Sequence, residues 1–545
     1  MNKLLFSAAI IGCTFSIQAQ SGFTTSNLPI MVISTNGQEI TDEPKVDAQM
    51  GLIDNGSGVL NHISDPANAY SGAIGIELRG SSSFFYEKRP YSIELRDNAG
   101  ADQDVSLLGM PPESDFALIS PLNDKSLIRD VFSYTIAREV MPWAPRTRYV
   151  EVVLNGEYIG VYVLLETVKR DSNRVNITKI KDTDITGPEL TGGYIIRIDK
   201  DDGNGGIGND WASQYPPVPG GWQQTWFQHF YPKNVDLATE QQNYIRNYIK
   251  AFDNMMAGPN FNTSVENWVD IDSWVNYLLV QEVSKNIDGY RISAYLYKDR
   301  DDAPNGGKIT MGPVWDFNIT YGIGDYCEGI DPKGWGKDFN SICGSDGYLI
   351  HFWWEKMWNN PVFRQRLLTR WQELRSTVWS NEKMLAKTDS LVNVIGDAQV
   401  RNFQRWQVLG TYVWPNSYIG PTYGSEVNFM KNWLVARLAW MDVNIQALQQ
   451  SSVDPEFEKA DFVVYPNPSN GKMYVKTDAV IHSSSFTVQL FDQLGRQVFE
   501  EKYIDAIGVF WVELPVGKLT KGVYTCVITN QDRKTTYREQ VLIEW

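Results

Sequence analysis

The hydrophobic pattern changes twice along this chain, and those changes limit the folds that it can adopt. Residues 21 to about 120 alternate polar and apolar positions between turns rich in glycine and asparagine, which is typical of β-strands. Segments such as 272–285, 363–374 and 427–448 instead repeat apolar residues at helical spacing. After residue 462, short alternating segments return, as in a small β-sandwich. The pattern predicts an α+β chain that ends in a separate β-domain.

Several local elements of the first part can be predicted individually. Residues 74–78 and 91–95 alternate with period two and predict strands. Residues 124–140 place apolar side chains on one face and predict a helix. Residues 149–166 predict a β-hairpin, because Asn155-Gly156 separates two alternating runs and this dipeptide favours a tight turn.

Size and composition indicate a globular protein with one large core and a second domain. The chain has 545 residues, of which 43% are hydrophobic, and its 19 tryptophans and 27 tyrosines are too many for a disordered chain. The formal net charge of −16 argues against a general nucleic-acid binder, since that class requires a basic face.

The first twenty residues resemble a secretory signal peptide. Lys3 supplies the positive start, residues 4–15 an apolar run, and Ala19 a small residue before the cleavage point. The apolar run is shorter than the roughly 20 residues of a membrane-spanning helix, and no later segment is long and apolar enough. We therefore expect an exported protein without a transmembrane segment. A polar linker is expected at 449–460, between a domain at 21–448 and another at 461–545.

Cys327 and Cys343 flank a glycine-rich segment, and export favours a disulfide between them, with two free buried thiols as the alternative. Cys526 stands alone in the final domain. The absence of a CxxC pair and the count of four histidines argue against a zinc site.

Asp288 and Asp316 are the main candidates for chemistry. Asp288 is expected to end a helix, after which two strands and a polar turn lead to Asp316. Since a hairpin brings its outer ends together, both carboxylates are expected at the same end of the ribbon. One could deprotonate or orient a hydroxyl group while the other holds Mg²⁺ on phosphates. The alternative is that both aspartates cap turns.

A second candidate set begins at Arg79 and includes Ser81 and Lys88. A Gly/Ser turn can direct N–H groups and hydroxyls at phosphate oxygens, and a lysine that opens the next strand could reach the same phosphates. The sequence has no Walker A loop. Glu166 begins a charged run that is either a solvated exit from a strand or a hinge between lobes.

Residues 200–235, rich in glycine, proline and tryptophan, predict a long functional or inserted loop. Its aromatic residues could stack on sugars, although anchors that pack the loop against the protein are the alternative explanation. These residues are Trp211, Tyr215, Trp222, Trp226 and Phe227.

Six segments in order resemble the CotH family of spore-coat-type atypical protein kinases, and the likeness covers roughly residues 28 to 445. The segments are 78–83 (LRGSSS), 88–95 (KRPYSIEL), 124–129 (DKSLIR), 155–166 (NGEYIGVYVLLE), 285–291 (KNIDGYR) and 312–318 (GPVWDFN).

This resemblance implies a divergent two-lobed protein-kinase-like fold that binds ATP and Mg²⁺ or Mn²⁺. Lys88 would be the phosphate-binding lysine, Asp288 the catalytic aspartate and Asp316 the metal-binding aspartate. Glu166 would lie near the hinge. Many relatives have an aspartate where this chain has Asn318, and an asparagine where it has Ser293, so weaker metal binding is expected.

The C-terminal segment resembles a type IX secretion sorting domain, by the residues YPNP at 465–468, DQLGR at 492–496 and LTKGVY at 519–524. This resemblance implies export by the type IX machinery, followed by release or attachment at the cell surface.

Two functions follow as hypotheses. The first is an exported kinase-like phosphotransferase acting on a protein or another hydroxyl acceptor, such as a surface polymer. The second is an inactive kinase-like scaffold that binds or adheres, for example to glycans.

Overall fold

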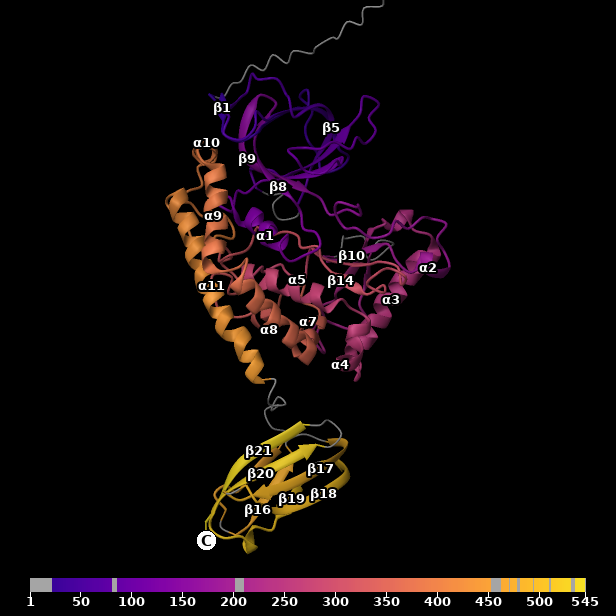
Figure 1. Cartoon of the computed structure of the whole chain (residues 1–545), viewed down its shortest axis with the longest axis vertical. Helices are drawn as coiled ribbons and strands as arrows, with labels where there is room; N and C mark the ends of the chain where they lie inside the picture. The colour runs from indigo at the N-terminus through magenta and orange to yellow at the C-terminus, as the bar shows by residue number, and fades with distance from the viewer. Residues whose placement is uncertain are drawn as a thin grey trace, which may run out of the picture. The chain divides into compact units, whose positions relative to one another are not determined.

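The computed structural model describes residues 22–80, 86–200, 210–451, 462–469, 471–477, 481–493, 495–508, 511–530 and 535–544. The predicted signal peptide and most of the predicted linker lie outside these residues. The chain forms two compact units, the first ending at Val443 and the second beginning at Asn444 (Figure 1). Among the described helices, none combines the length and the apolar character that a bilayer crossing requires.

A closed seven-stranded β-barrel forms the first part of the larger unit (Figure 1). Antiparallel pairings join neighbouring strands, and a parallel pairing of the second strand with the eighth, which sets Ile30 opposite Glu151, closes the ring. The predicted hairpin is present, with its strands joined at Asn155-Gly156. In spatial order the strands are β2 (Ile30–Ser34), β3 (Val46–Ile53), β5 (Tyr70–Leu78), β6 (Tyr91–Arg96), β7 (Asp115–Ile119), β9 (Glu157–Glu166) and β8 (Thr147–Leu154).

Alternation of buried side chains along these strands fills the barrel. Met50, Ile76, Ile93 and Phe116 belong to one buried cluster, as the period-two pattern predicts. The short strands β1 (Thr25–Ser26) and β4 (Asn61–His62) pair outside the barrel.

The helix α1 (Arg129–Ala137) is shorter than the predicted 124–140. Residues 124–128 instead form a turn, because the Asp124 carboxylate accepts hydrogen bonds from the backbone N–H groups of Ser126 and Arg129. Leu127 adopts a φ of 62°, which a helix cannot contain. The hydrogen bonds of the Asp124 side chain therefore prevent the helix from beginning at residue 124, although the apolar spacing predicts that it does.

A five-stranded sheet follows the barrel, in the order β11 (Asp210–Ala212), β12 (Trp226–Tyr231), β10 (Tyr194–Asp199), β13 (Ala294–Lys298), β14 (Ile309–Met311). The prediction of a continuous loop over 200–235 is wrong at β11 and β12. These strands form because β12 pairs with β10 over its whole length. The glycine- and proline-rich residues that flank them are typical of loops, so the sequence pattern does not indicate this pairing.

Helices make up the rest of the larger unit (Figure 1). The buried helix α5 is apolar on nearly every face, as expected of a helix surrounded by protein. It ends where Lys285 takes a φ of 41°. The helices are α2 (Gly187–Leu190), α3 (Thr239–Ala257), α4 (Phe261–Ser264), α5 (Ile271–Ser284), α6 (Phe339–Ile342), α7 (Trp353–Asn359), α8 (Pro361–Ser376), α9 (Asn381–Ile395), α10 (Ala398–Arg405) and α11 (Tyr423–Ser451).

The smaller unit contains one three-stranded and one four-stranded antiparallel sheet, which share a single apolar core. The strands are β15 (Phe462–Tyr465), β16 (Met473–Thr477), β17 (Ile481–Phe491), β18 (Gln497–Gly508), β19 (Trp511–Leu514), β20 (Gly522–Asn530) and β21 (Thr535–Ile543). The predicted α+β class and the final β-domain are confirmed.

Candidate functional site

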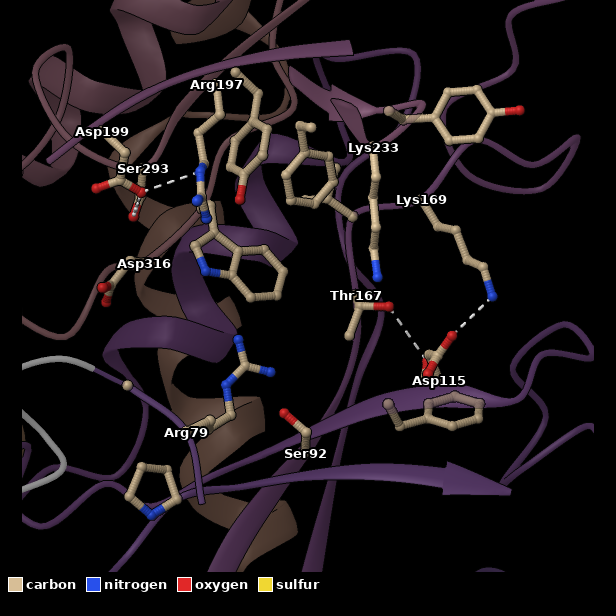
Figure 2. Close-up of a pocket in the computed structure, with 18 of the residues that line it drawn as sticks. Arg79, Ser92, Asp115, Thr167, Lys169, Arg197, Asp199, Lys233, Ser293 and Asp316 are labelled. Atoms are coloured by element: carbon tan, nitrogen blue, oxygen red, sulfur yellow. Dashed lines mark hydrogen bonds and ion pairs between the residues drawn. The ribbon is translucent and has the colours of Figure 1, made fainter. Parts of the chain in front are cut away.

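A cavity of about 1280 Å³ in the larger unit is lined by the barrel, by α1 and by the loops after α5 and β14. Figure 2 shows Asp199, Ser293 and Asp316 on one side and Lys169 and Lys233 on the other. Pockets for small ligands commonly measure roughly 300–1,000 Å³. The cavity is therefore large enough for a nucleotide-sized ligand together with part of a second molecule.

Asp288 and Asp316 both line this cavity. Asp288 lies in the turn after α5, not on the helix itself, and Asp316 follows β14. The strands between them pair with Leu296 opposite Met311, so the two flanking segments leave the ribbon at the same end.

The backbone at Asp316 is held in an uncommon conformation, with a φ of 60°. Its N–H donates to the Tyr134 hydroxyl at 3.1 Å, and its carbonyl accepts from Asn286 Nδ2 at 2.9 Å. The next N–H, of Phe317, donates to Asp130 Oδ1 at 3.0 Å. A non-glycine residue in this region costs about 1–3 kcal/mol, so these bonds fix where the Asp316 side chain points.

Carboxylates concentrate around Asp316. Burial raises the pKa of Asp316 to about 6, with further contributions from Asp288 and Asp199, while Arg79 lowers it. Burial, followed by Asp316, raises the pKa of Asp130 to about 8. Like charges at short range favour protonation or a bound cation.

Asp288 also has a raised pKa, first because of burial. Arg291 and Lys200 act in the opposite direction, and Arg291 Nη2 donates to Asp288 Oδ1 at 2.7 Å. One fifth of the Asp288 side chain remains exposed. The carboxylate is therefore oriented by an arginine and still faces the cavity.

Arg79 is the positive group nearest to these carboxylates on the barrel side. Its guanidinium points into the cavity (Figure 2) and lies 5.6 Å from the Trp315 ring centroid. Among the described residues, the guanidinium makes no hydrogen bond or ion pair, whereas the backbone N–H of Arg79 donates to Pro90 O at 3.2 Å. Gly80 beside it lines the cavity with a φ of 93°, whereas Ser81 lies outside the described residues. Asn318 lines the same cavity.

Lys88 and Glu166, two other predicted site residues, do not lie among the residues that line the cavity. Lys88 is 1% exposed, and its ammonium donates to Val161 O at 2.6 Å and Asn402 Oδ1 at 2.9 Å. Glu166 is fully buried and accepts from the N–H and the guanidinium of Arg146, both at 2.8 Å. Glu166 is the last residue of β9, whereas Lys88 lies in the bend before β6 and does not open that strand. Sequence spacing could not show that both side chains face partners inside the protein.

Asp199 and Asp130 are cavity residues that the sequence reasoning missed. Asp199 ends β10, and the pairing of Ile198 with Ala294 brings it beside Ser293, whose hydroxyl lies 3.5 Å from Asp199 Oδ2. A carboxylate at the end of a mostly apolar strand was a weak local signal. The position of Asp199 beside Ser293 depends on the order of strands in the sheet, which the local sequence does not show.

The predicted aromatic cluster is mostly packed. Phe227 is fully buried, and Trp211 packs against Phe227 and under the Arg246 guanidinium. Trp222, by contrast, is 75% exposed. The cluster therefore anchors its segment and leaves one indole at the surface.

Comparison with known families gives two matches. The family described as CotH kinase protein matches residues 76–441. The family described as secretion system C-terminal sorting domain matches residues 463–544. The sorting-domain match confirms the prediction of a secreted or cell-surface protein and implies the type IX machinery. A search of curated proteins finds no match.

Proposed function

The chain belongs to the CotH kinase family, and from this premise we propose that it is an exported phosphotransferase. It would transfer the terminal phosphoryl group of ATP to a hydroxyl group of a protein or surface polymer. In a two-lobed kinase-like arrangement, the barrel would be one lobe and the helical part the other. The family match supports this arrangement.

One observation carries the proposal: Asp288 and Asp316 line a single cavity, and Asp288 contributes to the raised pKa of Asp316. Burial of two like charges is costly unless a ligand compensates them. A divalent cation with a polyphosphate is a ligand class that does so.

Arg79 is the phosphate contact that this geometry favours, because its guanidinium enters the cavity without a hydrogen-bonding partner among the described residues. Ser81, which lies outside the described residues, is proposed as a second contact from its position in the sequence alone. Lys88, first assigned to the phosphates, and Glu166, first assigned to the hinge, would support the barrel wall through their internal partners.

Asp316 and Asn318 would hold Mg²⁺ or Mn²⁺. Within the described residues, no group of three or more His, Cys, Asp or Glu side chains is arranged to hold a metal. This fits a cation that takes one or two protein ligands and completes its shell with phosphates and water. The bound cation would neutralise negative charge on the phosphates.

Asp288 would accept the proton of the acceptor hydroxyl. The hydroxyl oxygen forms a bond to the terminal phosphorus as the bond from that phosphorus to the bridging oxygen breaks, and ADP leaves. The raised pKa of Asp288 makes it a better proton acceptor than an exposed aspartate.

The test is transfer of the terminal phosphate of labelled ATP with Mg²⁺ or Mn²⁺, in the wild type and in Asp288→Asn and Asp316→Asn. We expect each variant to lose at least about 100-fold in rate. Asp272→Asn, at the exposed start of α5, is the matched control and should keep full activity. Equal labelling by the wild type and both site variants would exclude the catalytic proposal.

A binding protein on an inactive kinase-like scaffold is the second candidate, and two observations favour it: a neutral Asn318 beside the carboxylates and an exposed Trp222. Glycan binding that is lost in Trp222→Ala, together with no binding of ATP in the presence of metal, would support this candidate over the first.

A further inference from the structure

The segment that carries Asp288 is held by one loop, residues 324–348, which we call the disulfide loop. The bond between Cys327 and Cys343 closes it across a separation of 16 residues, with the Cα atoms 5.7 Å apart. This confirms the predicted disulfide. Apart from one short 3₁₀ turn (Gly336–Asp338) and the four-residue α6, the loop lacks regular structure in the described chain.

Lys285 joins the disulfide loop to the end of α5. Its ammonium donates to three carbonyl oxygens of the loop, those of Glu328 at 3.0 Å, Asp331 at 2.9 Å and Lys333 at 2.6 Å. A lysine has three N–H donors, so the loop occupies them all.

Arg291 joins the other end of the loop to Asp288 itself. Nη1 donates to Asp346 Oδ1 at 3.2 Å and to Tyr348 O at 3.0 Å, while Nη2 donates to Asp288 Oδ1 at 2.7 Å. The guanidinium also lies 4.2 Å from the ring centroid of Phe339. Nε also donates to Ile287 O at 3.0 Å, outside the loop. Because a guanidinium is rigid and planar, its contacts with the loop contribute to its orientation towards Asp288.

Packing between these contacts is tight. A Cβ atom at Gly324 would lie 2.4 Å from Ile287 Cδ1, and one at Gly329 would lie 2.5 Å from the same atom. A side chain at either glycine would therefore have to displace the end of the Ile287 side chain, against which the loop backbone packs directly.

We infer that Arg291 is a positioning residue for Asp288, and that the Cys327–Cys343 bond is required to hold Arg291 in place. The inference rests on the function proposed above. Without the bond, the loop gains conformational freedom, the anchors at Asp346 and Tyr348 separate from Arg291, and the Asp288 carboxylate loses its orientation. Activity would then appear after export, when the loop is oxidised.

The required redox step is thiol–disulfide exchange. The two cysteine thiols release two protons and pass two electrons to an oxidised protein disulfide, which becomes a dithiol. Cytoplasmic conditions keep thiols reduced and exported proteins meet oxidants, so the change accompanies export.

The first experiment compares Arg291→Gln, Arg291→Lys and the double variant Cys327→Ser/Cys343→Ser with the wild type. We expect kcat to fall about 100-fold in Arg291→Gln and in the double variant, with KM for ATP unchanged. Arg291→Lys should recover part of the loss, since it keeps the charge without the planar fork. Reduction of the disulfide in the Arg291→Gln variant should cause no further loss of kcat, because loss of the disulfide and loss of the arginine act through the same contact. Arg375→Gln, which breaks a multiply bonded arginine pair with Asp442, is the matched control and should retain kcat.

The second experiment does not depend on catalysis. Hydrogen exchange of the amides in residues 286–292 should accelerate on reduction of the wild type and in Arg291→Gln, but not in Arg375→Gln. Unchanged exchange and unchanged kcat after full reduction would refute the inference. If the wild type transfers no phosphate but exchange accelerates on reduction, the proposed function fails while the positioning role stands.

Discussion

The cavity side and the barrel side of the larger unit use their charged residues in opposite ways. On the side formed by residues 286–293 and 315–318, Asp288 and Asp316 face the cavity, and burial raises the pKa of both. In the barrel, Lys88 and Glu166 also belong to the family segments, yet both are satisfied by protein partners.

This difference shows how a charged residue in a shared motif can serve either the ligand or the fold. A charged side chain that lacks enough ionic or hydrogen-bonding partners within the protein can bind a cation or a phosphate. A buried charge whose donors or acceptors are all used by neighbouring groups instead holds the structure together. The predictions below separate the two cases, from the largest expected effect to the smallest.

Asp316→Asn should produce the largest change. It removes the carboxylate proposed to hold the cation, so ATP affinity measured by calorimetry with Mg²⁺ should fall at least about 100-fold, or roughly 2.7 kcal/mol. Affinity without metal should change little. If binding with Mg²⁺ is unaffected, Asp316 does not serve the ligand and the contrast between the two sides disappears.

Lys88→Met should lower the stability of the fold and leave the affinity for ATP unchanged. It removes the buried ammonium donor from Val161 O and from Asn402 Oδ1, which keeps only the Val161 N–H at 3.1 Å, and this costs about 1–3 kcal/mol of unfolding free energy. Denaturant unfolding should show this loss, whereas the Kd for ATP should stay within about twofold. A large loss of ATP affinity in a protein of normal stability would return Lys88 to the phosphate site.

Asp130→Asn tests the carboxylate cluster through pH. The folded-state pKa of Asp130 is about 8, above its unfolded value, so its stabilising contribution is complete at low pH and is lost as pH rises towards 8. Relative to the variant, the wild type should lose up to about 1.4 kcal/mol per pH unit between pH 4 and 8. Unfolding curves at pH 5.5, 7 and 8.5 measure this; a constant difference would contradict the raised pKa.

Glu166→Gln should give the smallest effect. The amide oxygen can still accept from the Arg146 N–H, but the charged bond to the guanidinium is lost, which costs about 1 kcal/mol. ATP binding should be unchanged, and the measurement is the unfolding midpoint. Weaker ATP binding with an unchanged midpoint would instead place Glu166 at the ligand.

The sequence predicted local elements well where a short pattern contained the cause. Asn155-Gly156 located the hairpin of β8 and β9, and the apolar spacing of residues 272–285 located α5 almost to the residue. It failed where a side chain competes with the backbone, as at Asp124, and where a strand has a distant partner, as at β12.

By itself, the sequence determined the α+β class, the C-terminal sorting domain, the family, and a ribbon that returns Asp316 towards Asp288. Those features depend on periodicity, on turn residues and on motifs that lie within a few positions of one another. The tertiary structure decided the closure of the barrel by β2 and β8, the direction of the Lys88 ammonium, and the contacts of Arg291 with the disulfide loop. These depend on pairings between residues far apart in the chain, for which no local pattern carries the information.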